Sequence, residues 1–264
     1  MRDLVLALAQ TALHWEAPKL NRCAFSKLLR DLPADTDLVV LPEMFTTGFS
    51  MNAEAIAEDN AERTLPWLQQ QAAKHDVAIT GSIAVREADA CYNRLFFVTP
   101  DGAHRHYDKR HLFTLSGEQH HYRAGRQRLI VEWRGWRVCP VVCYDLRFPV
   151  WLRNRACGHA DSYDLLLVVA NWPAKRRQHW RQLLMARAIE NQAYSVVVNR
   201  LGQDGNGLDY AGDSLAVAAD GDLLLDCEDK PGLHAVVLPS DPLLRFRSKF
   251  EALKDADDFV VKNV

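Results

Sequence analysis

The chain is predicted to be an α/β protein in which helices cover a sandwich of mostly β layers. Short apolar runs rich in β-branched residues alternate along the sequence with segments of helical periodicity, and hairpins lie between some of them. Several of the runs are apolar at almost every position, which is typical of strands buried on both faces. No linker, repeat or low-complexity segment divides the chain, so we expect a single domain over residues 1–264.

The first half of the sequence predicts four strands and two helices. The strands are expected at residues 4–9, 37–41, 77–85 and 91–98, where apolar residues are nearly continuous. Residues 17–32 and 65–75 have the apolar spacing of amphipathic helices. The segment 102–107 then leads into the charged sequence D-K-R-H-L-F at residues 108–113.

A hairpin over residues 129–142, with Gly135 in its turn, opens the second half and ends in a thiol, Cys143. Pro149 suits the first turn of a helix, because that position needs no N–H donor, so Cys143 is expected at a strand-to-helix turn. Further strands are predicted at 165–170, 194–198, 215–217 and 223–225, with a helix from Pro173 to about residue 192. Residues 202–212 are expected to form a glycine-rich loop.

Composition excludes several classes of protein. The net charge is −2, so no broad attraction to nucleic acid or anionic membrane is expected. No stretch reaches the roughly 18 apolar residues of a membrane span, and the N-terminal residues are expected to form a strand rather than a signal peptide. The six cysteines contain no C-x-x-C pair, so no metal is expected, and reduced thiols predict a cytoplasmic protein.

Three reactive side chains follow apolar strands. Glu43 follows the strand at 37–41, Lys109 follows another strand or a short loop from it, and Cys143 follows the hairpin. Because sites in α/β proteins collect beyond the carboxyl ends of strands, these residues are candidates for one active site. Each has a structural alternative: a buried cysteine, a loop or capping glutamate, and a surface lysine beside Asp108 and Arg110.

These three residue types together predict nucleophilic attack by a thiol on an amide. A carboxylate can take the thiol proton, and an adjacent cation is expected to lower the thiol pKa. The Lys109 ammonium and the backbone N–H of Tyr144 could stabilise the oxyanion, each such donor being worth roughly 3 kcal/mol. Glu43 could then protonate the leaving nitrogen and activate water for hydrolysis of the thioester.

The sequence resembles the nitrilase superfamily of carbon–nitrogen hydrolases over residues 4–237. The resemblance rests on five segments: L-P-E-M-F at 41–45, Y-D-K-R-H-L-F at 107–113, V-C-Y-D-L-R-F-P at 142–149, A-N-W-P at 170–173 and R-A-I-E-N at 187–191. It implies Glu43 as general base, Lys109 as oxyanion stabiliser and Cys143 as nucleophile. Glu118 matches a second family glutamate that orients Lys109 or the substrate amide.

The resemblance also implies a four-layer α-β-β-α sandwich without a cofactor. It implies a homodimer in which the C-terminal tail, about 241–264, packs on the partner subunit; this tail is charged and shows little periodicity beyond Pro242. One departure is Val150, where many members have a glutamate. That glutamate is not one of the catalytic three, so the departure affects a local salt-bridge network rather than the reaction.

The motif combination is similar to the omega-amidase branch, which hydrolyses the terminal amide of 2-oxoglutaramate and 2-oxosuccinamate. An aliphatic nitrilase, an N-carbamoyl hydrolase or an acyl transferase would use the same three residues, and a non-catalytic scaffold is the alternative outside enzymes. A small anionic substrate needs a cation and apolar walls. The candidates on the motif loops are Phe45, Phe113, Tyr144, Arg147, Asn171 and Trp172. For Arg147, a structural ion pair with Asp145 or a neighbouring helix is favoured slightly.

Five histidines, at positions 104, 106, 111, 120 and 121, could indicate a metal site or a Cys–His dyad. Because a carboxylate is available as the base, we interpret these histidines as polar loop residues.

Overall fold

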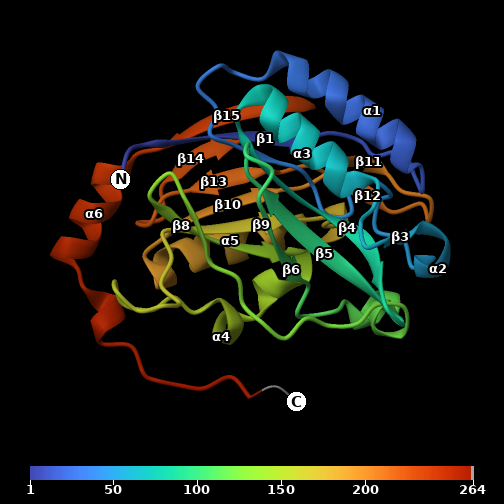
Figure 1. Cartoon of the computed structure of the whole chain (residues 1–264). Helices are drawn as coiled ribbons and strands as arrows, with labels where there is room; N and C mark the ends of the chain where they lie inside the picture. Colours follow the sequence, from blue (N-terminus) through green and yellow to red (C-terminus); the bar gives the residue numbers. More distant parts are fainter. Residues whose placement is uncertain (263–264) are drawn as a thin grey trace.

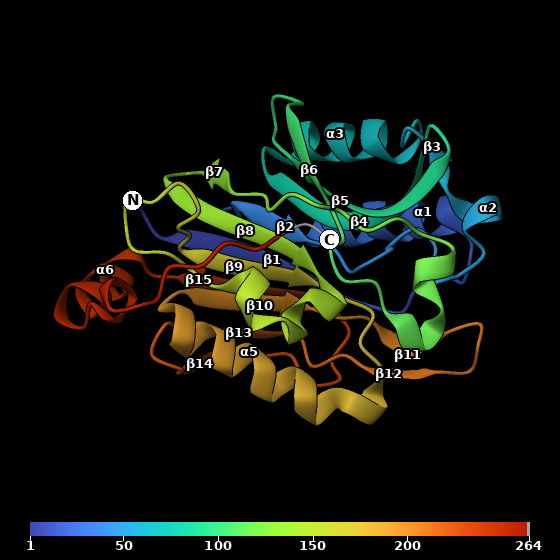
Figure 2. The ribbon, with the colours of Figure 1, turned by 90° about the horizontal axis from the view of Figure 1, so that it is seen from below.

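Two β-sheets stacked face to face form the centre of the molecule, and helices cover their outer faces (Figures 1 and 2). The computed structural model describes residues 1–262. The predicted four-layer α-β-β-α sandwich is therefore confirmed.

The first sheet combines parallel strands at its centre with antiparallel strands at both edges. From edge to edge it contains β15 (Gly232–Leu238), β1 (Leu4–Gln10), β2 (Leu38–Val40), β4 (Ala78–Glu87), β5 (Ala90–Val98) and β6 (His104–Asp108), and β3 (Glu58–Asp59) pairs with β4. The parallel strands β1, β2 and β4 are joined through helices, as parallel strands require.

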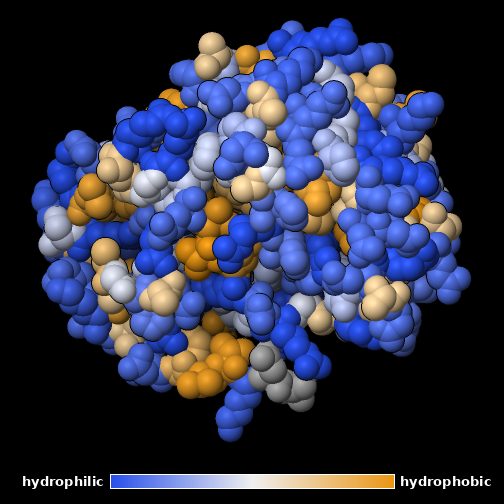
Figure 3. Space-filling model, in the orientation of Figure 1, coloured by the Kyte–Doolittle hydropathy of each residue, from blue (hydrophilic) through white to orange (hydrophobic). Residues whose placement is uncertain are grey.

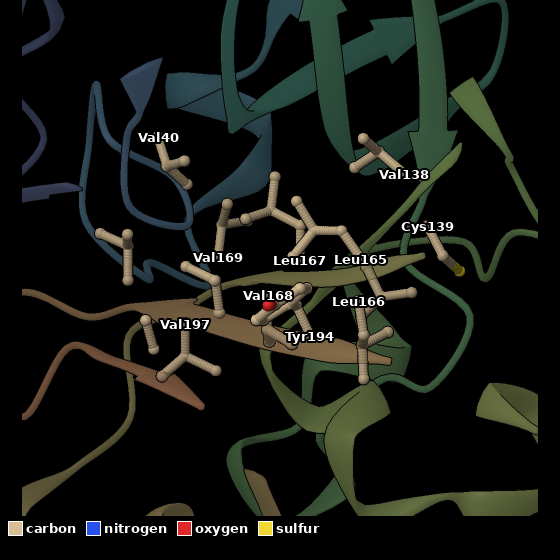
Figure 4. Packing of buried hydrophobic residues seen from close by; sticks show 14 of the residues in the cluster. Val40, Val138, Cys139, Leu165, Leu166, Leu167, Val168, Val169, Tyr194 and Val197 are labelled. Atoms are coloured by element: carbon tan, nitrogen blue, oxygen red, sulfur yellow. The ribbon is translucent and has the colours of Figure 1, made fainter. Parts of the chain in front are cut away.

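The second sheet has the same plan, with the parallel strands β8, β9 and β10 at its centre. From edge to edge it contains β14 (Leu223–Asp226), β13 (Leu215–Val217), β10 (Tyr194–Val198), β9 (Leu165–Val169), β8 (Trp136–Val142) and β7 (Val131–Trp133). Figure 4 shows its side chains pointing to both faces, with Leu167 and Val169 on one side of β9 and Leu166 and Val168 on the other. This alternation explains the continuous apolar run, because both faces of the strand are covered.

Helices α1 (Pro18–Leu28) and α3 (Thr64–His75) cover the first sheet, and α5 (Arg177–Asn191) covers the second (Figure 2). The short helices are α2 (Ala53–Ile56), α4 (Pro149–Leu152) and α6 (Ser240–Lys249). Strand β1 shows how the layers meet. Its residues Leu4, Leu6 and Leu8 pack between the sheets, whereas Ala7 and Ala9 pack toward α1 and α3.

Two helix boundaries differ from the predictions. Helix α1 ends at Leu28 and continues as a short 3₁₀ turn, Leu29–Asp31. Helix α5 begins at Arg177 rather than at Pro173, because residues Ala174–Arg176 form a separate 3₁₀ turn.

The segment 202–212 was predicted as a loop, and that prediction is wrong. It forms most of a two-stranded hairpin, β11 (Leu201–Gln203) and β12 (Asp209–Ala211). The carboxylate of Asp204 accepts hydrogen bonds from the backbone N–H groups of Asn206 and Leu208, which closes the turn.

The irregular tail predicted beyond residue 242 is also partly wrong, because α6 lies there. Leu243 and Phe246, three residues apart, pack onto the core and give this short helix its apolar side. The Arg247 guanidinium donates to Asp164 (2.6 Å) and to the carbonyls of Tyr163 and Gln192 (both 2.7 Å). The helix is therefore held by its own chain.

The six cysteines are free thiols. Within residues 1–262, no helix combines the length and apolar character that crossing a membrane requires. The face of the molecule in Figure 3 is mainly hydrophilic, with apolar residues in small patches.

Candidate active site

Cys143 lies at a sharp turn directly after β8, where the 3₁₀ turn Cys143–Arg147 begins. Its φ is 44°, in the left-handed region that non-glycine residues rarely adopt. The turn is held by the buried carboxylate of Asp145, which accepts bonds from the N–H of Val142 (3.1 Å), the N–H of His111 (2.9 Å) and the hydroxyl of Tyr107 (2.8 Å). Asp145 thus connects the turn at Cys143 to the segment after β6.

Glu43 and Lys109 meet in direct contact beside this turn. The Lys109 Nζ donates to Glu43 Oε1 at 2.9 Å and to both carboxylate oxygens of Glu118, at 2.9 and 3.1 Å. All three side chains are buried. The other oxygen of Glu43, Oε2, accepts from the backbone N–H of Asn171 at 2.8 Å, and the Asn171 side chain donates to the Glu43 carbonyl.

The site lies where the ends of the two sheets meet. Glu43 follows β2 and Lys109 follows β6, both in the first sheet, whereas Cys143 follows β8 and Asn171 follows β9, both in the second sheet. The predicted convergence of three strand ends is therefore what the structure shows. The reactive groups face one another across the sandwich rather than along a single sheet edge.

The surroundings of the buried thiol favour its protonated form. Burial and the Glu43 carboxylate raise the pKa of Cys143 well above its ordinary value, and Lys109 lowers it by less. Lys109 thus lowers the thiol pKa as expected, but burial and the Glu43 carboxylate outweigh its contribution. Burial also lowers the pKa of Lys109, but the charges of Glu118 and Glu43 more than offset this and raise it. Lys109 thus remains an ammonium.

Asn93 is a member of the site that the sequence analysis missed. Its Nδ2 donates to Glu43 Oε1 at 2.8 Å and to Glu118 Oε1 at 3.3 Å, so one amide connects the two carboxylates. The available signal was a single uncharged polar residue within the apolar strand at 91–98. A buried amide in such a strand requires polar partners.

A cavity of about 470 Å³ opens above these residues. Of the predicted residues, it is lined by Glu43, Lys109, Phe113, Cys143, Tyr144, Arg147, Asn171 and Trp172. Glu118 lies behind Lys109 rather than on the wall. The mixture of aromatic walls and a few charged groups is typical of a site for a small polar ligand.

The prediction that Phe45 contacts substrate is wrong. Its side chain is fully buried on the outer side of the first sheet, with its ring 5.5 Å from that of Phe25 and 5.8 Å from that of Trp67. It lies two residues after Glu43 in a turn, and these ring contacts show that its side chain is directed toward α1 and α3 and away from the cavity.

Within residues 1–262, Arg147 does not form the structural ion pair that was favoured for it. Asp145 binds His111, Tyr107 and backbone groups, whereas the Arg147 guanidinium lies 4.7 Å from the ring centre of Trp172 and bonds His179 at 3.2 Å. Arg147 and Trp172 therefore form one part of the cavity wall.

Further walls come from segments that carried no recognised motif. Residues Trp15 and Glu16, the loop 49–52, the side chain of Arg176 and the turn of the β11–β12 hairpin all line the cavity. Gly205 in this hairpin packs against Trp15, and a Cβ there would lie 2.4 Å from the indole nitrogen. These loops are brought together only by the fold.

The histidines do not form a metal site. No group of potential ligands suited to a metal ion occurs within residues 1–262. The interpretation as loop residues is wrong for His104 and His106, which lie in β6. The His111 ring stacks on that of Phe148, with ring centres 3.8 Å apart, and bonds Asp145 at 2.8 Å, so it supports the turn at Cys143.

Fold and site together define a hydrolase of carbon–nitrogen bonds. The chain belongs to the carbon-nitrogen hydrolase family, whose model matches residues 7–238. It is 47% identical to the omega-amidase YafV of Yersinia enterocolitica, over 99% of this chain and all of that protein. It is 35% identical to the 2-oxoglutaramate amidase of Bacillus subtilis, over 75% of this chain and 76% of that one.

A solved structure has almost the same fold. It is a CN-hydrolase superfamily protein from Xanthomonas campestris with an arsenic adduct in its active site. It superposes with a TM-score of 0.96 at 45% identity, covering 99% of this chain and all of that chain.

Proposed function

We propose that this protein is an omega-amidase that hydrolyses the terminal amide of a small 2-oxo acid amide, 2-oxoglutaramate or 2-oxosuccinamate. The observation that carries the proposal is the meeting of Cys143, Glu43 and Lys109 at the floor of one cavity with an arginine on its wall. Its relatives named omega-amidase and 2-oxoglutaramate amidase support the same reaction.

The first half of the reaction forms a thioester. As Cys143 Sγ attacks the amide carbon, Glu43 takes the thiol proton, because burial raises the thiol pKa and favours the protonated form. The oxyanion accepts hydrogen bonds from the Lys109 ammonium and the N–H of Tyr144. Glu43 then gives its proton to the nitrogen, the C–N bond breaks and ammonia leaves.

The second half restores the enzyme. A water molecule gives a proton to Glu43 and attacks the thioester carbon, and the C–S bond breaks as the 2-oxo acid forms. The thiolate takes the proton back from Glu43. Glu118 and Asn93 contact Glu43 and Lys109 and not the reacting atoms, so they act as positioning residues. No cofactor is needed at any step.

Ammonia release from 2-oxoglutaramate tests this proposal. Wild type and a Cys23→Ala variant, which changes an exposed cysteine in α1, are expected to release ammonia at the same rate. Cys143→Ala is expected to lose activity by at least about a thousandfold, because Cys143 is the only thiol among the described residues that line the cavity. Activity retained by Cys143→Ala would contradict the mechanism, and activity only on nitriles or N-carbamoyl compounds would contradict the substrate.

The same experiment separates the remaining alternatives. A non-catalytic scaffold releases no ammonia from any amide, nitrile or carbamoyl compound. An acyl transferase forms product only when a second nucleophile is supplied. The three reactive groups in contact favour turnover over a scaffold role.

We also propose that the protein is a cytoplasmic homodimer. Free thiols throughout the chain support a reducing compartment. Leu244 and Phe250, exposed by 51% and 59%, support a partner that covers the C-terminal segment. Light scattering that returned the mass of one chain would contradict the dimer.

A further inference from the structure

Two arginines on the cavity wall have no carboxylate partner in the part of the chain that the structure describes. Arg147 and Arg176 both line the cavity, and neither makes an ion pair within residues 1–262. The neighbouring Arg177 provides the contrast, because it binds Asp213 through two bonds of 2.7 and 2.9 Å. The chain thus neutralises the arginine outside the cavity and leaves those inside it without a counter-ion.

Each of these guanidinium groups lies over an aromatic ring, and a hydrogen bond holds the backbone of Arg176. Arg147 lies 4.7 Å from the ring centre of Trp172, and Arg176 lies 5.5 Å from that of Phe113. The Trp172 indole N–H donates to the carbonyl of Arg176 at 2.9 Å, which ties the 3₁₀ turn Ala174–Arg176 to the wall. Planar guanidinium groups held on rings are prepared to receive a carboxylate.

The two positive charges are close enough to affect each other. Burial and the charge of Arg176 lower the pKa of Arg147. Two cations in a partly dry cavity repel each other until an anion lies between them. The other acidic groups of the lining are already engaged: Asp204 with its own hairpin and Tyr210, and Glu16 with Ser50.

We propose that Arg176 and Arg147 together bind the carboxylate of the substrate. Arg176 is therefore a determinant of specificity for anionic amides. This inference rests on the proposed function and deepens it. The amide of the substrate lies at Cys143, and the carboxylate of the substrate lies between the two guanidinium groups. The loop 171–176 then serves both ends of the substrate, because Asn171 holds Glu43 at one end and Arg176 contacts the carboxylate at the other.

The activity test compares an anionic and a neutral amide. Arg176→Gln is expected to lower kcat/KM for 2-oxoglutaramate roughly 10- to 100-fold, mainly through KM, as loss of a charge-assisted hydrogen bond predicts. For pentanamide, which has the same chain length and no carboxylate, kcat/KM should stay close to the wild-type value. Arg176→Lys should recover part of the loss. The matched control is Lys175→Gln, an exposed cation next in sequence that does not line the cavity.

A binding test separates this inference from the proposed function. Calorimetry measures 2-oxoglutarate binding to Cys143→Ala and to Cys143→Ala with Arg176→Gln. The second protein should bind about tenfold or more weakly, and added salt should reduce the difference. Equal binding by both proteins, or no binding by either, would overturn the role of Arg176. Weaker binding in the variant together with an inactive wild type would retain the arginine pair and overturn the omega-amidase proposal.

Discussion

At the scale of single residues, a sequence pattern identifies a functional side chain more readily when it follows a strand than when it lies inside a strand. Glu43 and Cys143 could be predicted because each comes at the end of an apolar run, and Lys109 because it follows a strand segment, although that segment is mostly polar. Asn93 could not, because it lies inside β5 and its meaning depends on which side of that strand faces the site. Phe45 was wrongly predicted to contact substrate. It lies only two residues from Glu43 in the sequence, but in a turn this closeness does not determine where the side chain points.

Substitution of Asn93 tests whether its amide balances the two carboxylates. Asn93→Ala removes the donor to Glu43 and Glu118, and kcat should fall roughly 10- to 100-fold, with little change in KM because Asn93 does not line the cavity. Asn93→Asp keeps the shape but adds a third carboxylate beside a single ammonium, so a larger loss is expected. Steady-state kinetics on 2-oxoglutaramate measures both. A more active Asn93→Asp than Asn93→Ala would indicate that shape, and not charge, determines the effect.

At the scale of elements, strands buried on both faces were predicted well and short elements were not. The continuous apolar runs gave β1, β4, β9 and β10 almost directly. The β11–β12 hairpin was missed because polar and glycine residues dominate it, and its turn depends on the Asp204 carboxylate. Helix α6 was missed because only Leu243 and Phe246 reveal its apolar side among many charges.

The docking of α6 predicts which of its arginines matters for stability. Arg247→Ala removes bonds to Asp164 and to two backbone carbonyls, and should lower the free energy of unfolding by about 1–3 kcal/mol. Arg245 is the control on the same helix, since it is exposed and lies 3.7 Å from exposed Asp241. Its alanine variant should change stability by less than about 0.5 kcal/mol. Urea denaturation measures both, and equal effects would contradict this account of α6.

At the scale of the whole molecule, the site exists only when both sheets are stacked. The apolar runs predict that a sandwich forms, but they carry no information on which strand ends meet across it. That pairing follows from the register of inner side chains, such as Leu4, Leu6 and Leu8 of β1, against the second sheet. The expectation that the site residues converge therefore depends on the five sequence motifs that resemble the nitrilase superfamily.

The protein also buries thiol and phenol groups, and their burial should lower its stability at alkaline pH. Burial raises the pKa of Cys143 and of the hydroxyls of Tyr107, Tyr122, Tyr163 and Tyr210. In the unfolded chain, cysteine and tyrosine lose these protons at about pH 8.5–10, whereas the native protein keeps them. The unfolded state then binds fewer protons than the native state, so the free energy of unfolding falls as pH rises.

The expected profile is flat from about pH 7 to 8 and falls steeply between about pH 9 and 11, each group contributing up to about 1.4 kcal/mol per pH unit above its unfolded pKa. Urea denaturation at several pH values measures it. Tyr163→Phe is the diagnostic variant. It loses the hydroxyl bond to the Leu152 carbonyl, so it should be less stable at pH 8, and it also loses one titrating group, so its slope above pH 9 should be shallower. A wild type as stable at pH 10.5 as at pH 8 would show that these protons are released without unfolding, and that solvent reaches the buried hydroxyls.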